Sequence, residues 1–398
     1  MKKIIAISMM FALVAGAVFA DTTISGATET RFSLAKQLGA DGDDPKMGGS
    51  IGAAQIKLAG SNAEGTLGGA FRLKQTGFGK GTNGEALYDQ VFVWWKPTPQ
   101  VKVFLGIDQD GLFDTADFVG WGFHSGDNDY IFNHGWDFWR QIFPGNWDGF
   151  GLALSFYPIP GLDLNLVLPT GKVGWRQAPE TGVFMSRPIT DTDSDSHDGM
   201  LPGRLRFSGN YSLDFGKVSF VYLGGGVVSD KGSAWLGNYG AGAIAKDNNG
   251  LVGASVLVTA IDGIQLKVGG SIILTDPDSI INVGLGVAYT GDGFGVKARV
   301  GVVMQGDGDP FITLNIMPVL AAGEKGQALF DIGITSQGDE LGWSVIPAYR
   351  LSIPNGAFKI GLQVFNNVGN KDGLGGNVGI SGLDYVRWNI PMLLSFNF

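Results

Sequence analysis

Residues 281–302, INVGLGVAYTGDGFGVKARVGV, contain two alternating segments separated by a tight turn, and this pattern decides the fold. In the first segment every second residue is large and apolar, while the residues between them are Asn282 or small. After Gly-Asp-Gly at 291–293, the second segment alternates in the same way, with Lys297 and Arg299 at polar positions. A period of two places alternate residues on opposite faces of a β-strand, and Gly-Asp-Gly is a hairpin signal. The stretch therefore predicts an antiparallel hairpin with one apolar and one polar face.

The same alternation recurs from Thr23 to Phe398 in segments of about ten residues, the length with which a tilted strand crosses a membrane. Short and longer connections follow one another, as in a barrel with turns on one rim and loops on the other. The short connections are residues 62–65, 97–100, 158–161, 214–216, 261–263, 291–293, 321–326 and 354–356. The pattern predicts an all-β fold, a transmembrane antiparallel up-and-down β-barrel of about eighteen strands. Residues 234–245 leave the count open, with about sixteen strands as the alternative.

The composition agrees with this interpretation and excludes several others. The chain has no cysteine, which excludes disulfides, thiolate metal sites and a cysteine nucleophile. It contains 65 glycines and only 16% charged residues, and no segment after the N-terminus is apolar for long enough to be a helical span. The net charge of −9 argues against nucleic-acid binding. An array of soluble β-sandwiches would need linkers, and no linker-like change of composition is present.

Residues 1–20 have the pattern of a secretory signal peptide. Lys2 and Lys3 supply a short positive region, residues 4–19 are apolar or small, and the segment ends at the small residue Ala20. A membrane anchor would need a longer apolar span. We therefore expect residues 1–20 to direct export and residues 21–398 to form the barrel.

Residues 109–149 interrupt the alternation with a long segment that is both acidic and aromatic. Loops of this length in a compact fold are functional or disordered, and the many aromatic residues argue against disorder. We expect this loop, which follows the fifth strand, to fold into the mouth of the barrel and narrow it. The alternative is a surface flap packed by its own aromatic side chains. The acidic residues expected at the constriction are Asp110, Asp114, Asp117, Asp127 and Asp129.

Basic residues within the strands share the polar face, which predicts that they line the interior. A charged side chain on the lipid face is energetically costly. Charged residues that occur only at alternate positions of a strand therefore mark the face that points away from lipid. The candidates are Arg31, Arg72, Lys74, Lys102, Arg206, Lys297, Arg299, Arg350, Lys359 and Arg387. With the loop against this wall, opposite charges would face each other across a narrow passage and orient dipolar solutes. The alternative for each single residue is an ordinary solvated wall charge.

These features together resemble a bacterial outer-membrane porin: an export signal, amphipathic strands, short turns rich in proline and glycine, and a final strand that ends at Phe398. The resemblance implies a water-filled channel for small hydrophilic solutes and ions in the outer membrane. It also implies an inward loop after the fifth strand, recognition of Phe398 by the barrel-assembly machinery, and a homotrimer surrounded by outer-membrane lipid.

A second hypothesis concerns sugars, because aromatic faces beside carboxylates suit sugar rings, and maltoporin-like channels are similar in strand number. The residues proposed to stack on solute are Trp121, Trp136, Trp139 and Trp147, and the alternative is that they pack the core of the loop. A third hypothesis is a surface adhesin or a structural barrel, in which the long outer loops bind a partner.

The sequence contains no pattern that favours an enzyme, a metal site or a cofactor. Asp191, Asp193 and Asp195 resemble the start of a calcium loop, but the glycine and glutamate that complete an EF-hand are missing. The three histidines fall in loops without the spacing of a metal site. No serine motif accompanies them, so we expect a protein without catalytic activity.

Overall fold

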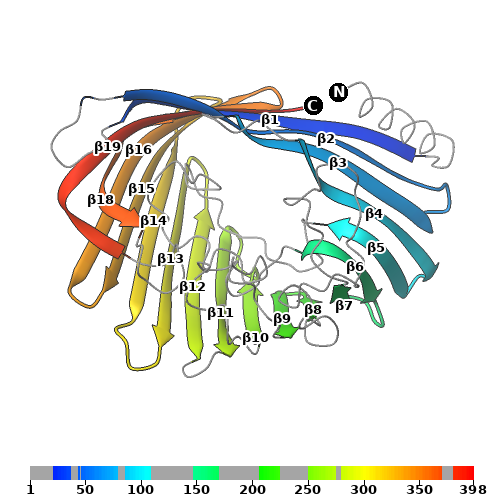
Figure 1. The fold of residues 1–398 in the computed structure, drawn as a ribbon. Coiled ribbons are helices and arrows are strands. Elements are labelled where there is room, and N and C mark those ends of the chain that lie inside the picture. Colours follow the sequence, from blue (N-terminus) through cyan, green and yellow to red (C-terminus); the bar gives the residue numbers. More distant parts are fainter. Residues whose placement is uncertain are drawn as a thin grey trace, which may run out of the picture.

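The computed structural model describes residues 21–36, 44, 46–78, 86–108, 147–169, 206–224, 250–274, 279–369 and 380–398. Within these ranges the regular structure consists of β-strands (Figure 1). None of the described segments is a helix that is long and apolar enough to span a membrane.

The strands fall into two runs along the chain. The first run comprises β1 (Asp21–Lys36), β2 (Lys46–Ser61), β3 (Leu67–Phe78), β4 (Ala86–Thr98), β5 (Val101–Asp108), β6 (Trp147–Phe156), β7 (Leu162–Pro169), β8 (Arg206–Leu213) and β9 (Gly216–Gly224). The second run comprises β10 (Gly250–Val258), β11 (Ile264–Leu274), β12 (Ile280–Thr290), β13 (Phe294–Gln305), β14 (Phe311–Ala321), β15 (Gly326–Gln337), β16 (Glu340–Ile353), β17 (Gly356–Gly361), β18 (Gln363–Gly369) and β19 (Ile380–Asn397).

The strands form one closed antiparallel barrel in which sequence neighbours pair, and β1 pairs with β19 to complete the ring. The segments β17 and β18 are two halves of one strand, because both pair with β16 and with β19 and only Leu362 separates them. Nineteen segments therefore make eighteen strands, and the prediction of an all-β barrel of this size is confirmed. Closure leaves no unpaired strand edge, which a lipid environment requires.

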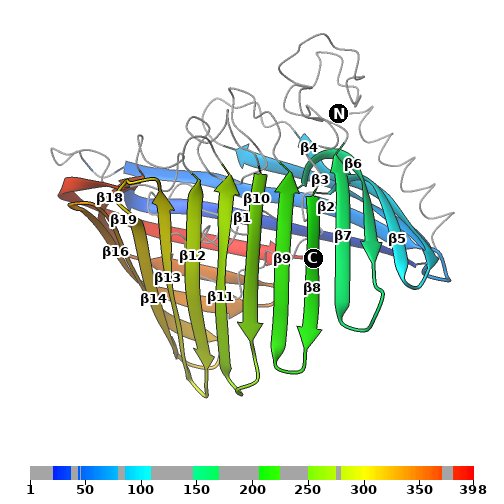
Figure 2. The ribbon, with the colours of Figure 1, turned by 90° about the horizontal axis from the view of Figure 1, so that it is seen from below.

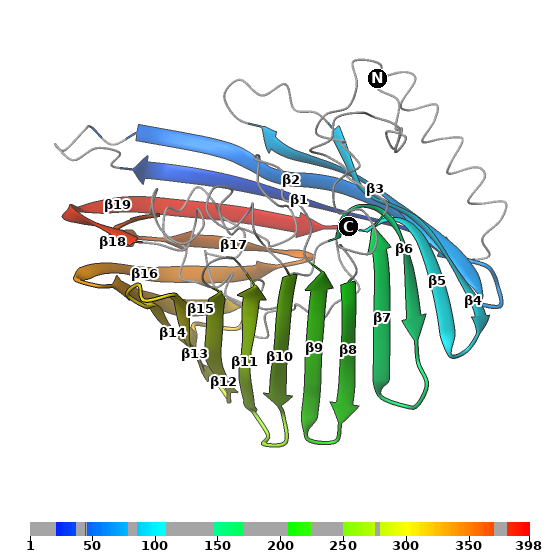
Figure 3. The same cartoon turned by 60° about the horizontal axis from the view of Figure 1, so that its bottom comes forward.

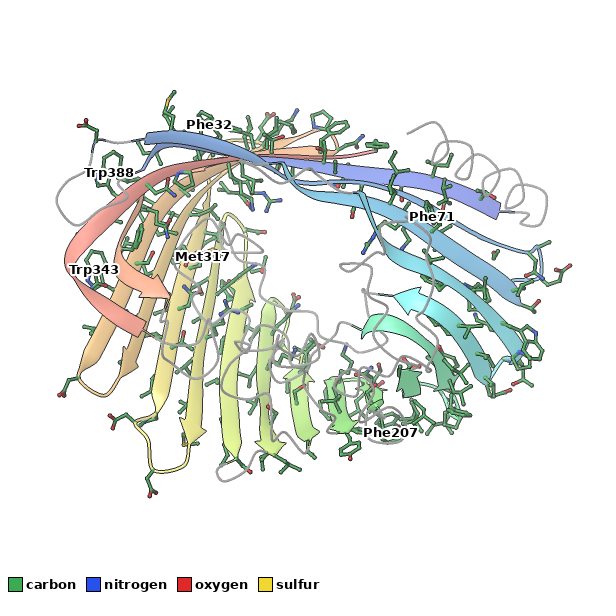
Figure 4. The ribbon with its side chains drawn as sticks, in the orientation of Figure 1. Phe32, Phe71, Phe207, Met317, Trp343 and Trp388 are labelled. Carbon is green, nitrogen blue, oxygen red and sulfur yellow. The ribbon has the colours of Figure 1, made fainter. Side chains whose placement is uncertain are left out.

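The distribution of apolar side chains is inverted relative to that of a soluble protein. In β14, Leu314 and Ile316 point outward and are 36% and 38% exposed, whereas their neighbours Thr313 and Asn315 point inward and are 4% and 0% exposed. Figure 4 shows the same division, with Phe207 projecting away from the barrel. A continuous exposed apolar exterior of this kind suits contact with lipid rather than water.

The short turns between β8 and β9 and between β10 and β11 lie along one edge of the barrel (Figures 2 and 3). The hairpin predicted at residues 291–293 joins β12 to β13, with the Gly291 amide donating to the Phe294 carbonyl at 2.8 Å. Gly293 has a φ of 73°, a left-handed conformation that glycine adopts without steric cost. On the opposite edge, residues 306–310 and 338–339 also form short connections, so the alternation of short and long connections is less regular than the sequence pattern predicts.

One sequence-based expectation is corrected by the strand register. The long loop was expected to extend to residue 149, but β6 already begins at Trp147, whose Cα lies opposite that of Asp108 on β5. Trp147 is therefore part of strand β6 in the barrel wall. Trp94 lies opposite the buried, inward-facing Phe104 and thus on the interior face, while Trp95 is 53% exposed on the exterior.

Candidate functional site on the interior wall

The interior face of the barrel is lined mainly by polar and small side chains. The buried polar residues are Arg72, Ser155, Asn165, Ser208, Ser219, Ser255, Lys267, Ser271, Arg299, Thr313, Asn315, Asp331, Ser344, Gln363 and Asn389. Among them, the Ser344 hydroxyl and both amide atoms of Gln363 are buried and make no hydrogen bond to the described protein. Buried polar groups in proteins are almost always paired with protein or water. This wall is therefore suited to contact with water.

The strand register aligns several cations on the interior face. Lys217 on β9 and Lys267 on β11 both lie opposite Leu257 of β10, one on each side. From Lys267 the same row continues through Gly286 of β12 to Arg299 of β13. Because each step of such a row is a direct cross-strand neighbour, positive charges from three strands are held at one level of the wall.

A second set of cations lies on the wall built by β2 to β5. Arg72 is buried on the interior face of β3, directly opposite Lys57 of β2. On the next strands, the ammonium groups of Lys96 and Lys102 lie 5.3 and 5.0 Å from the centroid of the Trp94 ring. These distances are within the range of cation–π attraction. The indole therefore holds two positive side chains near the short-turn end of this wall.

Interior acids are fewer among the described residues. Asp331 of β15 is 2% exposed, and its Oδ1 accepts a hydrogen bond of 2.7 Å from Asn315 Nδ2. The same Asn315 amide donates to the Ile332 carbonyl at 2.8 Å. Asn315 thus fixes this buried carboxylate beside the row that ends at Arg299, its direct neighbour on β13.

Replacing Asn315 by alanine is expected to destabilise the folded barrel by about 1 to 3 kcal/mol, because it removes the donor to a buried carboxylate and to a backbone carbonyl. The measurement is the free energy of unfolding from urea titrations in a fixed detergent. The matched control is Asp331→Asn, which keeps an acceptor oxygen for Asn315 and should cost less. An equal loss in both variants would contradict this role of Asn315.

The remaining predicted site residues are described in part or not at all. Lys297, Arg350 and Lys359 lie on the interior face of β13, β16 and β17. For Arg31, Lys74, Arg206 and Arg387, the structure gives positions in the strand register only. The loop residues Asp110, Asp114, Asp117, Asp127, Asp129, Trp121, Trp136 and Trp139 lie outside the described residues.

Sequence reasoning missed two interior cations, Lys96 and Lys217. Lys96 directly follows two adjacent tryptophans at the end of a strand, and Lys217 stands between the turn at residues 214–216 and the alternating segment that follows it. In both cases the signal is the two-residue period of the strand, which places every second residue on the same face. Lys96 is two residues from the inward Trp94, and Lys217 is two residues from the buried Ser219.

A closed antiparallel barrel with an apolar exterior and a polar interior defines the class of membrane-spanning β-barrels. No family model matches the chain, and no curated protein matches it in sequence. Among solved structures, OmpF of Salmonella typhi in complex with daunomycin aligns with a TM-score of 0.51 at 11% identity, covering 95% of this chain and 97% of that chain. This likeness concerns the fold, and it confirms the resemblance seen in the sequence: the chain has the fold of the bacterial outer-membrane porins.

Two further solved structures align more loosely. An anion-selective porin from Comamonas acidovorans has a TM-score of 0.47 at 12% identity, covering 95% of this chain and 99% of that chain. OmpT, an outer membrane protein of Vibrio cholerae solved in a trimer form, has a TM-score of 0.48 at 10% identity, with the same coverage.

Proposed function

We propose that this protein is an outer-membrane porin, a water-filled channel for the passive diffusion of small hydrophilic solutes and ions. The observation that carries the proposal is the inverted barrel, with apolar side chains outside and polar or charged side chains on the interior wall. A protein that needed only to anchor itself in lipid would gain nothing from interior cations such as Lys267 and Arg299. The same cations suit a passage for hydrated solutes.

The finer features of the proposal come from the sequence. We infer that the acidic segment after β5 folds inward and faces the basic wall, so that solutes pass through a transverse electric field. Export by residues 1–20, recognition of Phe398 by the barrel-assembly machinery and association into homotrimers are parts of the same proposal. The interior cations of the described wall would lie on the positive side of that field.

Reconstituting the refolded chain in a planar bilayer is expected to give discrete and stable conductance steps. The reversal potential under a salt gradient then reports whether cations or anions pass more easily. Swelling of liposomes that contain the protein should be fast with a pentose and slow with a tetrasaccharide, because a loop-narrowed passage excludes the larger solute. Liposomes that contain the unfolded chain are the control.

The outcome separates the candidate functions. Conductance that maltodextrins do not block supports a general diffusion channel, and block that depends on maltodextrin concentration favours the sugar channel. A folded barrel that gives no steps and no swelling would contradict the channel and favour an adhesin or a structural barrel.

A further inference from the structure

A cavity of about 450 Å³ lies at the short-turn end of the barrel, against the wall built by β12 to β17. Its lining includes the inward-facing residues Lys297, Met317, Gln327, Leu329, Arg350 and Lys359. All six lie within a few residues of the short turns that follow β12, β14 and β16. The cavity therefore lies at the short-turn end of the passage, and it adjoins the row of Lys217, Lys267 and Arg299, because Lys297 and Arg299 are successive interior residues of β13. Its volume is in the range of small-molecule sites.

The floor of the cavity is apolar. Met317 and Leu329 are 2% and 5% exposed and form a buried cluster with Ala288. Val319 and Ala348 pack against that cluster. Figure 4 shows Met317 on the inner side of the wall, whereas Phe32 projects outward. Asn315 and Asp331 occupy the next interior positions on β14 and β15, so this patch offers a solute a local apolar surface within a polar surrounding.

Cations border the apolar floor. Lys297 lies directly opposite Met317 on the neighbouring strand. Arg350 lies opposite Gln327 on one side and opposite Lys359 on the other, so two positive side chains are direct cross-strand neighbours. Like charges in directly opposed positions destabilise a sheet. An anion placed between Arg350 and Lys359 would reduce that repulsion.

Among the residues that the structure describes, the lining offers no competing negative charge. None of the described residues that line the cavity is acidic. The closest acid along β15 is Asp331, two positions beyond Leu329, and it already accepts a hydrogen bond from Asn315. The cavity therefore combines three positive side chains and one amide with an apolar floor, and this combination is complementary to a molecule with an anionic head and an apolar body.

We propose that this cavity binds small amphipathic carboxylates, with the carboxylate at Lys297, Arg350 and Lys359 and the apolar body on Met317 and Leu329. The guanidinium of Arg350 can bind both carboxylate oxygens at once. The inference rests on the proposed channel function, because a solute reaches the cavity through the lumen. It adds a substrate class to that function: small aromatic or branched aliphatic acids.

Binding is measured by isothermal titration of the refolded full chain in detergent micelles with benzoate, acetate and benzamide. Benzoate is expected to bind at least about ten-fold more tightly than acetate, because only benzoate covers the apolar floor. It should also bind at least about ten-fold more tightly than benzamide, which has the same shape without the charge.

Three variants assign the binding to the cavity. The double variant Arg350→Gln/Lys359→Gln should bind benzoate about ten-fold or more weakly, because it removes two charged partners of the carboxylate. Met317→Gln keeps the size of the side chain and should bring the affinity for benzoate close to that for acetate. Lys57→Gln removes one interior charge on β2, a strand that contributes no residue to the cavity lining, and should leave benzoate binding unchanged.

Equal affinity for benzoate and acetate, or benzoate binding that both cavity variants retain, would overturn the assignment. Met317→Gln is the deciding variant if the double variant does not refold. Conductance of the same preparation separates this inference from the function on which it rests. Conductance without benzoate binding refutes the site and leaves the channel, while binding without conductance refutes the channel and leaves the site.

Discussion

Replacing Gly26 by valine is expected to weaken the closure of the barrel by about 1 to 3 kcal/mol, the usual cost of overpacking a filled site. Gly26 lies on β1, where its amide donates to the Phe398 carbonyl at 2.8 Å and its carbonyl accepts from the Phe398 amide at 3.0 Å. The Phe398 ring occupies the space where a side chain at position 26 would lie. Any Cβ at this position must therefore displace the ring that covers the join between the first and last strands.

The sign of this effect opposes intrinsic strand propensity. Valine favours β-structure over glycine by a margin of at most about 1 kcal/mol, so the substitution would stabilise an open position. At Gly26 the steric conflict is expected to be larger than this gain. The measurement is the free energy of unfolding in detergent, with the shift between folded and unfolded bands on unheated gels as a second readout.

Two comparison variants isolate the contact. Thr28→Val introduces the same side chain two residues further along the same outward face, opposite Phe396 and away from the Phe398 ring, and should be nearly neutral. In the pair Gly26→Val/Phe398→Ala the obstruction is gone, so the double variant should be no less stable than Phe398→Ala alone. Additive losses in the double variant would show that valine acts through something other than the Phe398 ring.

The faces of the strands were predictable from the sequence, because the two-residue period of a strand leaves no freedom once one face is apolar. Lys297 and Arg299 lie on the interior as that period requires. About eighteen strands were predictable because turns separate the alternating segments, with sixteen left as the alternative by residues 234–245. The alternation could not assign faces to Trp94 and Trp95, because both of these adjacent residues are apolar. Only the pairing of Trp94 with Phe104 shows which of them faces inward.

The rows across the barrel could not be derived from the sequence. A period of two assigns a face to each residue, but the level at which neighbouring strands align depends on turn geometry and bulges. The alignment of Lys217, Lys267 and Arg299 is therefore a structural result. The same holds for the cavity, whose floor and cations come from several strands. The start of β6 was misjudged because Trp147 continues an acidic and aromatic composition, although its backbone already pairs with β5.

Introducing arginine at Ile316 is expected to cost about 2 to 4 kcal/mol of folding free energy in a lipid bilayer, the range measured for a cation near the midplane of a transmembrane barrel. Ile316 lies at the centre of β14, points outward and is 38% exposed. Its direct neighbours on both sides, Ala298 and Ile332, are apolar as well. A guanidinium at this position would have no polar partner within the exterior face and would have to extend toward the membrane surface.

The matched variant is Leu320→Arg, on the same strand and the same face but one residue from the short-turn edge, where Leu320 is 44% exposed. At the interface the cost of arginine falls to about 0 to 1 kcal/mol, so the two variants should differ by at least about 2 kcal/mol in liposomes. Ile316 and Leu320 are almost equally exposed, so a barrel surrounded by water would tolerate arginine equally well at both positions. A difference that depends on depth along β14 is a property of a bilayer alone, and equal stability of the two variants would show that this apolar exterior is covered by something other than lipid.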